Sequence, residues 1–362
     1  MAENRPQCDL MTSADAHASG PQVRFLAPGA AERWDEFVLG HPQASFFHLL
    51  GWKRAIEKTF GFESQYFFCE RGGKITGVAP LFLISNWLAG RSLVSMPFAV
   101  YGGVCAADSE SEQALVDHVK RTAVSQQVDY LELRFRSGGL LNGFHANSRY
   151  VTFTGPLSAD HEVNRRRLPK DTRYMIRKGE KAGLEIRIGK DQLNQFYRLF
   201  AQSMKRLGTP VFPPALFRNL LDEFPEHAQL MLLYKGSRPV TGVLSFFFRD
   251  VILPYYAGAS PEAPRLAANN FMYWELMKWA ASRGFRWFDF GRSKKDTGAY
   301  AFKSQWGMRV EPLDYQVFLV KRKTVPNFSP ANPKFELATR IWKRLPLPLT
   351  KMLGPRVVGW FP

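Results

Sequence analysis

A pattern of strands, turns and a helix occurs twice along this chain of 362 residues, and it is the feature that most restricts the fold. Each half contains two apolar runs on either side of a Gly- or Pro-containing turn, at 66–82 in the first half and at 231–246 in the second. Runs rich in β-branched and aromatic residues around such a turn are typical of β-hairpins. The sequence therefore predicts one hairpin in each half.

The match continues beyond the hairpins. A further strand is expected to end at Tyr101-Gly102-Gly103 in the first half and at Tyr256-Ala257-Gly258 in the second. An amphipathic helix and then a strand are predicted next, at 112–125 and 130–135 in the first half and at 268–282 and 287–290 in the second. The shared order indicates an internal duplication, with an α/β (α+β) fold and a mixed sheet in each copy.

Two domains are also expected from the length, because single cores stop growing at about 250–300 residues. The repeat divides the chain into a leader predicted to be disordered, a first domain, a second domain and a basic, Pro-rich, amphipathic tail. The predicted bounds are 1–21, 22–155, 156–322 and 323–362.

The net charge is +17, from 49 Lys and Arg against 32 Asp and Glu. A field of this sign favours anionic partners such as nucleic acid, phosphorylated sugars or an acidic membrane face. The apolar runs are too short and too interrupted for a membrane span, and the His and Cys residues lack metal-ligand spacing. We expect a cytoplasmic protein that uses no metal.

The second copy carries two motifs, W-F-D-F-G at 287–291 and A-F-K-S-Q-W-G at 301–307, after a basic stretch at 168–184. With the duplication, these motifs resemble the Fem (FemABX) peptidyltransferases and the related BioF-like GNAT acetyltransferases. The most similar branch is the FemAB-related one associated with PEP-CTERM/exosortase systems and exopolysaccharide loci. The resemblance covers about residues 23–320 and implies two tandem GNAT-like acyltransferase domains.

The resemblance leaves the acyl donor open between acetyl-CoA or another acyl-CoA and an aminoacyl-tRNA, used as a co-substrate and not as a tightly bound cofactor. No heptad run provides the coiled arm of some tRNA-using members. The pyrophosphate loop of GNAT proteins corresponds to 265–270, which has the arginine but neither glycine. The residues predicted to contact the donor there are Arg265, Asn269 and Asn270.

Asp289 and Lys303 are the predicted catalytic residues. No Ser-His-Asp or Cys-His arrangement is visible, so we expect direct transfer without a covalent intermediate. Asp289 lies in an apolar strand and would accept a proton or anchor the amine; the alternative is that it holds a neighbouring loop through backbone N–H groups or Arg292. Lys303 would stabilise the oxyanion or a phosphate; the alternative is a surface lysine packed on Trp306.

Substrate binding is predicted on a basic segment, 165–187, with nine basic and three acidic residues. In a helix, four of the basic residues would share one face and suit consecutive phosphates of a diphosphate-linked sugar or an RNA backbone: Lys170, Arg173, Arg177 and Lys181. A solvated helix face is the alternative. The residues predicted to bind substrate are Lys170, Arg173, Arg177, Lys181, Tyr256 and Arg292.

Pro254 has no N–H and cannot sit in a regular central ladder. It favours a bulge or a splay in the strand 251–259, where a backbone N–H would meet the acyl carbonyl in a GNAT-like sheet. An edge strand is the alternative.

The segment 321–362 has nine basic residues and one acidic residue among interspersed aromatic and aliphatic ones. This composition indicates attachment to an anionic membrane surface, at the inner face of the cytoplasmic membrane; the alternative is a tail that packs on its own domain.

The predicted function is N-acyl or aminoacyl transfer to an amine of a phosphate-linked saccharide or peptide in envelope or exopolysaccharide biosynthesis. tRNA is a further expected partner if it carries the acyl group. The alternative is a non-catalytic basic adaptor that binds RNA or an anionic membrane on a retained GNAT-like fold.

Overall fold

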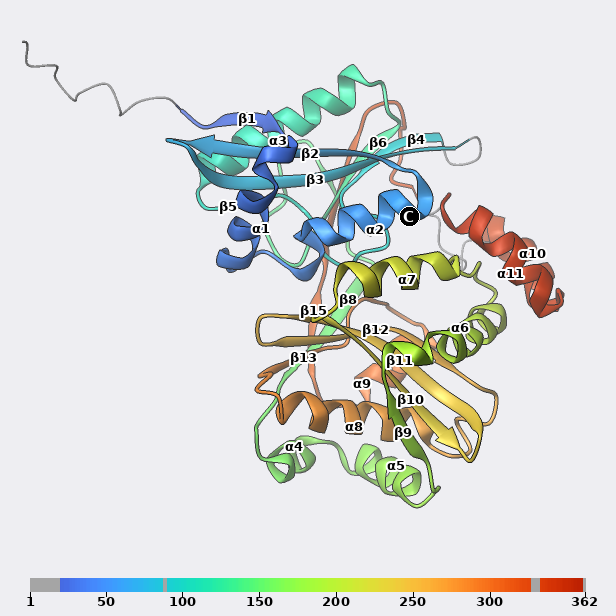
Figure 1. Cartoon of the computed structure of the whole chain (residues 1–362). Helices are drawn as coiled ribbons and strands as arrows, with labels where there is room; N and C mark the ends of the chain where they lie inside the picture. The colour runs from blue at the N-terminus through green and yellow to red at the C-terminus, as the bar shows by residue number, and fades with distance from the viewer. Residues whose placement is uncertain (1–19, 87–89, 327–332, 361–362) are drawn as a thin grey trace, which may run out of the picture.

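The computed structural model describes residues 20–86, 90–326 and 333–360, so nearly all of the predicted leader lies outside the described residues. Within these residues the strands form two eight-stranded mixed sheets with helices on their faces (Figure 1). The predicted α/β class with two sheets is confirmed.

The first sheet, sheet A, has the strand order β1-β2-β3-β4-β6-β16-β7, with β5 beside β3. The pair β4–β6 is parallel and the other neighbours are antiparallel. The strands are β1 (Gln22–Phe25), β2 (Glu63–Arg71), β3 (Lys74–Asn86), β4 (Gly90–Val94), β5 (Cys105–Ala106), β6 (Tyr130–Phe135), β7 (His145–Asn147) and β16 (Asp314–Leu319).

The second sheet, sheet B, has the order β14-β8-β13-β12-β11-β10-β9, with β15 beside β8. Here the pair β12–β13 is parallel. The strands are β8 (Tyr150–Pro156), β9 (Glu185–Ile188), β10 (Ala228–Lys235), β11 (Arg238–Phe248), β12 (Val251–Ala259), β13 (Trp287–Asp289), β14 (Ser293–Lys294) and β15 (Arg309–Pro312).

The two sheets repeat one arrangement. Each has an edge strand, a hairpin (β2–β3 or β10–β11), a parallel pair (β4–β6 or β12–β13) and then a strand contributed from elsewhere in the chain. That last strand is exchanged. Strand β8 lies at the end of the predicted first domain yet completes sheet B, and β16 lies at the end of the predicted second domain yet completes sheet A. The predicted boundary at 155–156 therefore separates the two sheets only in part.

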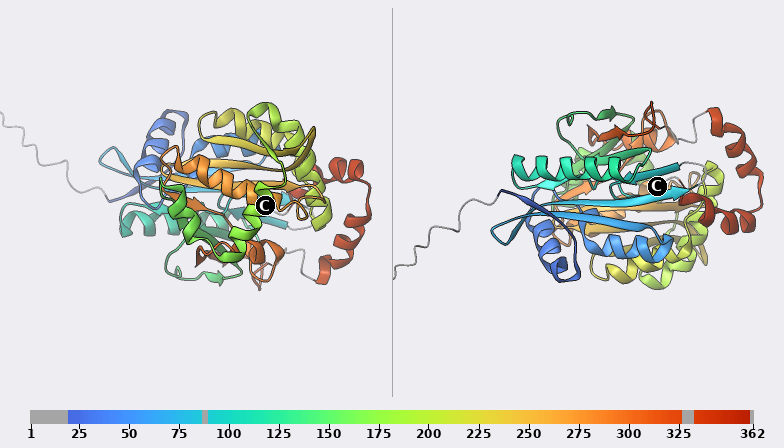
Figure 2. Two further views of the ribbon diagram at one scale, coloured as in Figure 1. Left: turned by 90° about the horizontal axis from the view of Figure 1, so that it is seen from below. Right: turned by 90° about the horizontal axis from the view of Figure 1, so that it is seen from above.

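Helices cover both faces of the sheets. In Figure 2, seen from above, α3 lies on one face of sheet A and α2 on the other. The helices of the first half are α1 (Ala31–Gly40), α2 (Leu50–Phe60) and α3 (Ser109–Ser125), with 3-10 helices η1 (Pro28–Ala30) and η2 (Phe46–His48). Those that follow are α4 (His161–Arg167), α5 (Lys170–Glu180), η3 (Lys190–Gln192), α6 (Leu193–Leu207), α7 (Pro214–Glu223), α8 (Ala268–Ala281), α9 (Gly298–Ser304), α10 (Pro333–Arg344) and α11 (Leu347–Val358).

The two predicted helices are confirmed as α3 and α8, but α8 is not amphipathic, because its residues are buried or half-buried along its whole length. Helix α3 begins three residues earlier than predicted because Asp108 caps it: its carboxylate accepts a hydrogen bond from the Ser111 N–H at 2.8 Å. An acidic N-cap satisfies an N–H that has no partner within the helix.

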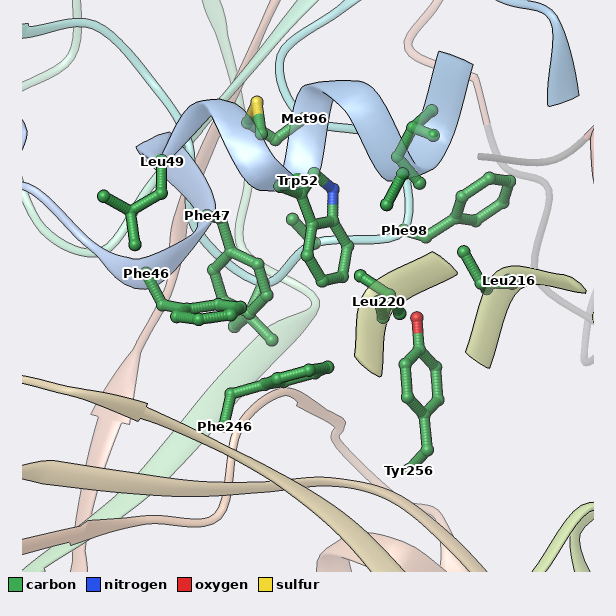
Figure 3. Packing of buried hydrophobic residues seen from close by; sticks show 14 of the residues in the cluster. Phe46, Phe47, Leu49, Trp52, Met96, Phe98, Leu216, Leu220, Phe246 and Tyr256 are labelled. Carbon is green, nitrogen blue, oxygen red and sulfur yellow. The ribbon is translucent and has the colours of Figure 1, made fainter. Parts of the chain in front are cut away.

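One apolar core joins the two halves. Phe46 stacks on Phe246 of sheet B with ring centroids 4.7 Å apart, and Phe47 packs edge-on against Trp52 at 4.8 Å (Figure 3). Each of these four side chains is completely buried. The two halves therefore share one apolar core.

The predicted strand end at 101–103 is wrong. Strand β4 stops at Val94, and residues 95–104, called here the 95–104 loop, are irregular. Met96 and Phe98 have left-handed backbone angles (φ 48° and 61°), which a strand does not accommodate. The loop is held from the other half, because the Tyr255 hydroxyl donates to the Phe98 carbonyl at 2.6 Å.

The prediction for Pro254 is confirmed. The register of β12 against β11 shifts between Pro254 and Tyr256, so that Tyr255 is a bulge. The parallel pairing of β12 with β13 ends at Ile252 and Phe288, which leaves the following part of β12 separated from β13. Since β12 lies between β11 and β13, the edge-strand alternative is wrong.

Candidate functional site

A cavity of about 760 Å³ opens between the two halves. Its walls come from η2 and the 95–104 loop on one side and from β8, β12, β13 and β15 on the other. The charged residues that line it are Arg134, Arg136, Arg167, Arg249, Arg309, Asp250, Asp289 and Glu311.

Asp289 is the most buried carboxylate of this cavity, with 1% of its surface exposed. One oxygen, Oδ1, accepts hydrogen bonds from the Thr152 hydroxyl at 2.6 Å and the Gly291 N–H at 2.8 Å. The other, Oδ2, accepts one from the Tyr101 hydroxyl at 2.8 Å. Oδ1 thus holds the turn after β13 through the Gly291 N–H, in agreement with the alternative that Asp289 holds a neighbouring loop. Oδ2 lies beside residues of the first half that line the cavity.

Arg136 and Tyr101 complete this cluster from the first half. The Arg136 guanidinium lies 3.8 Å from Asp289 Oδ2, 3.2 Å from Glu311 and 5.4 Å from the centre of the Tyr101 ring. Burial, together with the negative charge of Asp289, raises the pKa of Tyr101 well above its ordinary value. Tyr101 therefore stays protonated and donates to the carboxylate. The Asp289 cluster, as the term is used below, consists of Asp289, Tyr101, Arg136, Glu311 and Thr152.

Lys303, the other predicted catalytic residue, does not line the cavity. From α9 its ammonium group donates to the carbonyls of Phe290 (2.7 Å), Gly291 (3.1 Å) and Arg292 (3.2 Å). Burial lowers the pKa of Lys303 to about 8, although the negative charge of Asp289 favours the charged form. In the structure Lys303 fixes the turn that follows Asp289; a direct catalytic role stays a prediction.

Two predicted substrate residues, Tyr256 and Arg292, also lie away from the cavity lining. Tyr256 is 6% exposed and lies in the shared core (Figure 3). Its ring packs against Phe217, and its hydroxyl has no hydrogen-bond partner among the described residues. The Arg292 guanidinium lies 5.0 Å from the centre of the Tyr150 ring and 3.5 Å from the Tyr315 hydroxyl. Neither side chain is placed to meet a ligand of the cavity.

The predicted basic row forms on α5, which is a helix as expected. Lys170, Arg177 and Lys181 are exposed and Arg173 is half-buried. The helix packs on α8 through Gly179 and does not line the cavity, although Arg167, just before it, does. The row is a solvent-facing surface next to the cavity, and its role in substrate binding stays a prediction.

The predicted donor loop lies at the N-terminus of α8. The Asn269 side-chain carbonyl accepts a hydrogen bond from the Thr241 hydroxyl at 2.7 Å, Asn270 is buried and Arg265 is exposed. Ala267 adopts a left-handed conformation (φ 52°) there, a geometry that favours glycine. The loop thus makes a left-handed turn without the family's glycines; its contact with a donor stays a prediction.

Four members of the Asp289 cluster were missed by the sequence analysis: Tyr101, Arg136, Thr152 and Glu311. A signal existed for Arg136, because an arginine follows the last predicted strand in both copies. Thr152 and Glu311 belong to β8 and β15, which pair with each other, and no spacing in the sequence links them to Asp289.

The described residues contain neither a metal-binding group nor a membrane-spanning helix. No group of three or more His, Cys, Asp or Glu side chains is arranged to hold a metal ion. None of the helices in this part of the chain is both long and apolar enough to cross a membrane.

Residues 164–304 match the family model of the acetyltransferase (GNAT) domain. No curated protein matches the chain by sequence.

Among solved structures, the chain is similar to FemX (16% identity, TM-score 0.66, covering 88% of this chain and 100% of FemX). It is also similar to the C-terminal domain of a putative lysylphosphatidylglycerol synthetase from Agrobacterium fabrum (14%, 0.56, covering 80% and 91%). A third is a tandem GNAT protein from the clavulanic acid biosynthesis pathway (11%, 0.52, covering 84% and 100%).

The match over residues 164–304 supports an acyltransferase, so the predicted enzyme class is confirmed. The likeness to FemX and to the tandem GNAT protein shows that the chain shares their fold. The PEP-CTERM branch stays a prediction.

Proposed function

We propose that this protein transfers an acyl or aminoacyl group directly to an amine of a phosphate-linked saccharide or peptide, in the cavity between its two halves. The observation that carries the proposal is Asp289, a carboxylate buried in the GNAT domain that lines this cavity beside Tyr101 and Arg136. Assembly of the envelope or of an exopolysaccharide is the process that the sequence resemblance implies.

Each bond change of the proposed reaction has a place in this arrangement. The amine nitrogen attacks the donor carbonyl, so that a C–N bond forms and the C–S bond of a thioester, or the C–O bond of an aminoacyl ester, breaks. The nitrogen gives its proton to Asp289 Oδ2, which passes one to the leaving sulfur or oxygen. Tyr101 and Arg136 hold that oxygen in place, so the carboxylate is oriented before the amine arrives.

The arginines of the cavity support a phosphate-bearing acceptor. Arg309 is 82% exposed at its side chain, and Arg167 is exposed next to the basic row of α5. Arginine binds phosphate oxygens in a bidentate manner. An acceptor whose amine lies at Asp289 could therefore place its phosphates against Arg167 and Arg309.

The alternative of a non-catalytic adaptor is favoured by one observation. The opening between β12 and β13 is partly occupied by the 95–104 loop: a Cβ on Gly291 would lie only 3.6 Å from Val100, and Tyr255 is bonded to Phe98. In a GNAT-like sheet this opening is where the acyl group is expected. An adaptor would retain the fold and use its charge alone.

A transfer assay distinguishes the acyltransferase from the adaptor. Purified full-length protein is incubated with labelled acetyl-CoA, longer acyl-CoAs or aminoacyl-tRNAs, together with a panel of amine acceptors. We expect transfer from one donor class, with a higher kcat/KM for diphosphate-linked amines than for the same amines without phosphate. No transfer from any donor, together with RNA binding that weakens steeply with salt, would contradict the enzyme and support the adaptor.

A further inference from the structure

The C-terminal tail forms two helices, α10 and α11, separated by Pro346. They lie at one margin of the molecule outside α6 (Figure 1). Proline at the first turn of α11 suits the start of that helix and prevents one continuous helix through both segments.

Small side chains attach the tail to the second half. Gly354 lies so close to the chain at Val211 that a Cβ on it would be 2.7 Å from the Val211 nitrogen. Thr350 and Val358, one turn away on either side, are also buried. The inner face of α11 therefore packs on its own domain, as one alternative held.

Large apolar side chains remain on the outside. Leu337 and Ile341 of α10 are 69% and 54% exposed, and Leu349 and Met352 of α11 are 40% and 55% exposed. Each pair is spaced three or four residues apart and so shares a helix face. Large apolar side chains are usually buried, but here four of them are exposed on two adjoining helices while small residues are buried beneath. This distribution indicates an apolar contact surface.

The charge around these side chains is strongly positive. Six basic residues and one acidic residue lie between 333 and 358. Among the described side chains of these helices, the acidic residue, Glu336, pairs with Arg340 at 2.6 Å. Lys343, Arg344 and Arg356 are exposed, and no carboxylate of the described residues forms an ion pair with them.

We infer that α10 and α11 dock this protein on an anionic lipid bilayer. The exposed apolar side chains enter the interfacial region, and the surrounding Lys and Arg side chains contact the headgroups. An RNA would use the charges but give no reason for the exposed Leu, Ile and Met, and a second copy of this basic surface would be repelled. The inference goes beyond the proposed reaction and does not depend on it.

Co-sedimentation of the full-length protein with vesicles tests this. We expect binding to phosphatidylcholine vesicles that contain phosphatidylglycerol and much weaker binding to phosphatidylcholine alone. Replacing Arg344 and Arg356 by Gln should weaken binding to the anionic vesicles by roughly 25-fold, at about 1 kcal/mol per charge. Replacing the four exposed apolar residues by Ser should weaken it by at least about tenfold.

The matched control replaces Val124 and Leu140, which are 54% and 60% exposed on other elements, by Ser and should bind as the unchanged protein does. Thermal unfolding of each variant checks that it is folded. Equal binding to both kinds of vesicle, or unchanged binding by the tail variants, would overturn the inference. So would RNA binding or dimerisation that the tail variants lose while vesicle binding is absent. No donor or acceptor is present, so failure here leaves the proposed reaction unaffected.

Discussion

The two halves share a strand order but differ where the strand before the main helix ends. In the second half β12 runs nine residues, Val251–Ala259, and its Tyr256 lies in the shared core. In the first half β4 has only five, Gly90–Val94, and the chain leaves the sheet as the 95–104 loop. Tyr101, the counterpart of Tyr256, reaches across to Asp289.

The acidic residues of the last strands differ in the same way. Glu132 in β6 pairs at 2.7 Å with the buried Arg134 of its own strand, whereas Asp289 in β13 lines the cavity. In the proposed reaction the second copy supplies the proton acceptor. The first copy has an irregular loop in place of a regular strand end, and it contributes a wall of the cavity, the Tyr101 hydroxyl and Arg136.

The largest effect is expected from Asp289→Asn. Asparagine can still accept from Thr152 and Gly291, so the fold should be kept, but it cannot take a proton. We expect kcat to fall by about 100- to 10,000-fold, measured with the donor and acceptor that the transfer assay identifies. The matched control is Glu132→Gln in the first copy, which should lower stability but leave kcat of the folded fraction unchanged. Equal losses of kcat in both variants would break the distinction between the copies.

The second prediction concerns pH and the anchor of the 95–104 loop. His48 is buried in η2; its Nδ1 accepts from the Ser45 N–H at 3.1 Å, so its Nε2–H donates to the Gly103 carbonyl at 3.0 Å. This pattern requires the neutral ring, and burial lowers the pKa of His48 to about 4.

The unfolded chain, with a histidine pKa near 6.5, binds a proton between pH 6.5 and 4 that the folded chain does not. The stabilisation is therefore complete above pH 6.5 and is lost as the pH falls towards 4, by up to roughly 3 kcal/mol. Urea unfolding between pH 4 and 6.5 measures how the free energy of unfolding changes with pH. We expect the same slope in the wild type and in the exposed-site control His145→Gln, and a smaller slope in His48→Gln. An unchanged slope in His48→Gln would show that this ring is not the anchor.

The smallest effects are expected from a pair of equivalent tyrosines. Tyr101→Phe removes the hydroxyl that donates to Asp289 and should cost about 1.5–3 kcal/mol of unfolding free energy, because the acceptor is charged. Tyr256→Phe removes a buried hydroxyl that has no partner among the described residues, so its stability should be unchanged or higher. Chemical denaturation of both measures the difference. A larger loss in Tyr256→Phe would mean that this hydroxyl has a bound partner and would return Tyr256 to the ligand-binding candidates.

Much of this architecture followed from local patterns. The hairpins β2–β3 and β10–β11, the helices α3 and α8 and the bulge at Tyr255 each depend on residues close together in the chain. Asp289 could be selected because an acidic residue inside an apolar strand needs a partner wherever the strand packs. Lys303 was selected from the same motif, but its role as a donor to three carbonyls depends on how α9 folds back on the turn.

By itself, the sequence determined the repeated order of elements, the mixed sheets and the basic surfaces of α5 and the tail, because periodicity and charge are properties of neighbouring residues. Only the tertiary structure decided that β8 and β16 change places, that the first copy's tyrosine meets the second copy's aspartate, and which face of the tail is left exposed. Tyr101 and Asp289, for example, are 188 positions apart, and the geometry of such contacts depends on the packing of two whole sheets around one core.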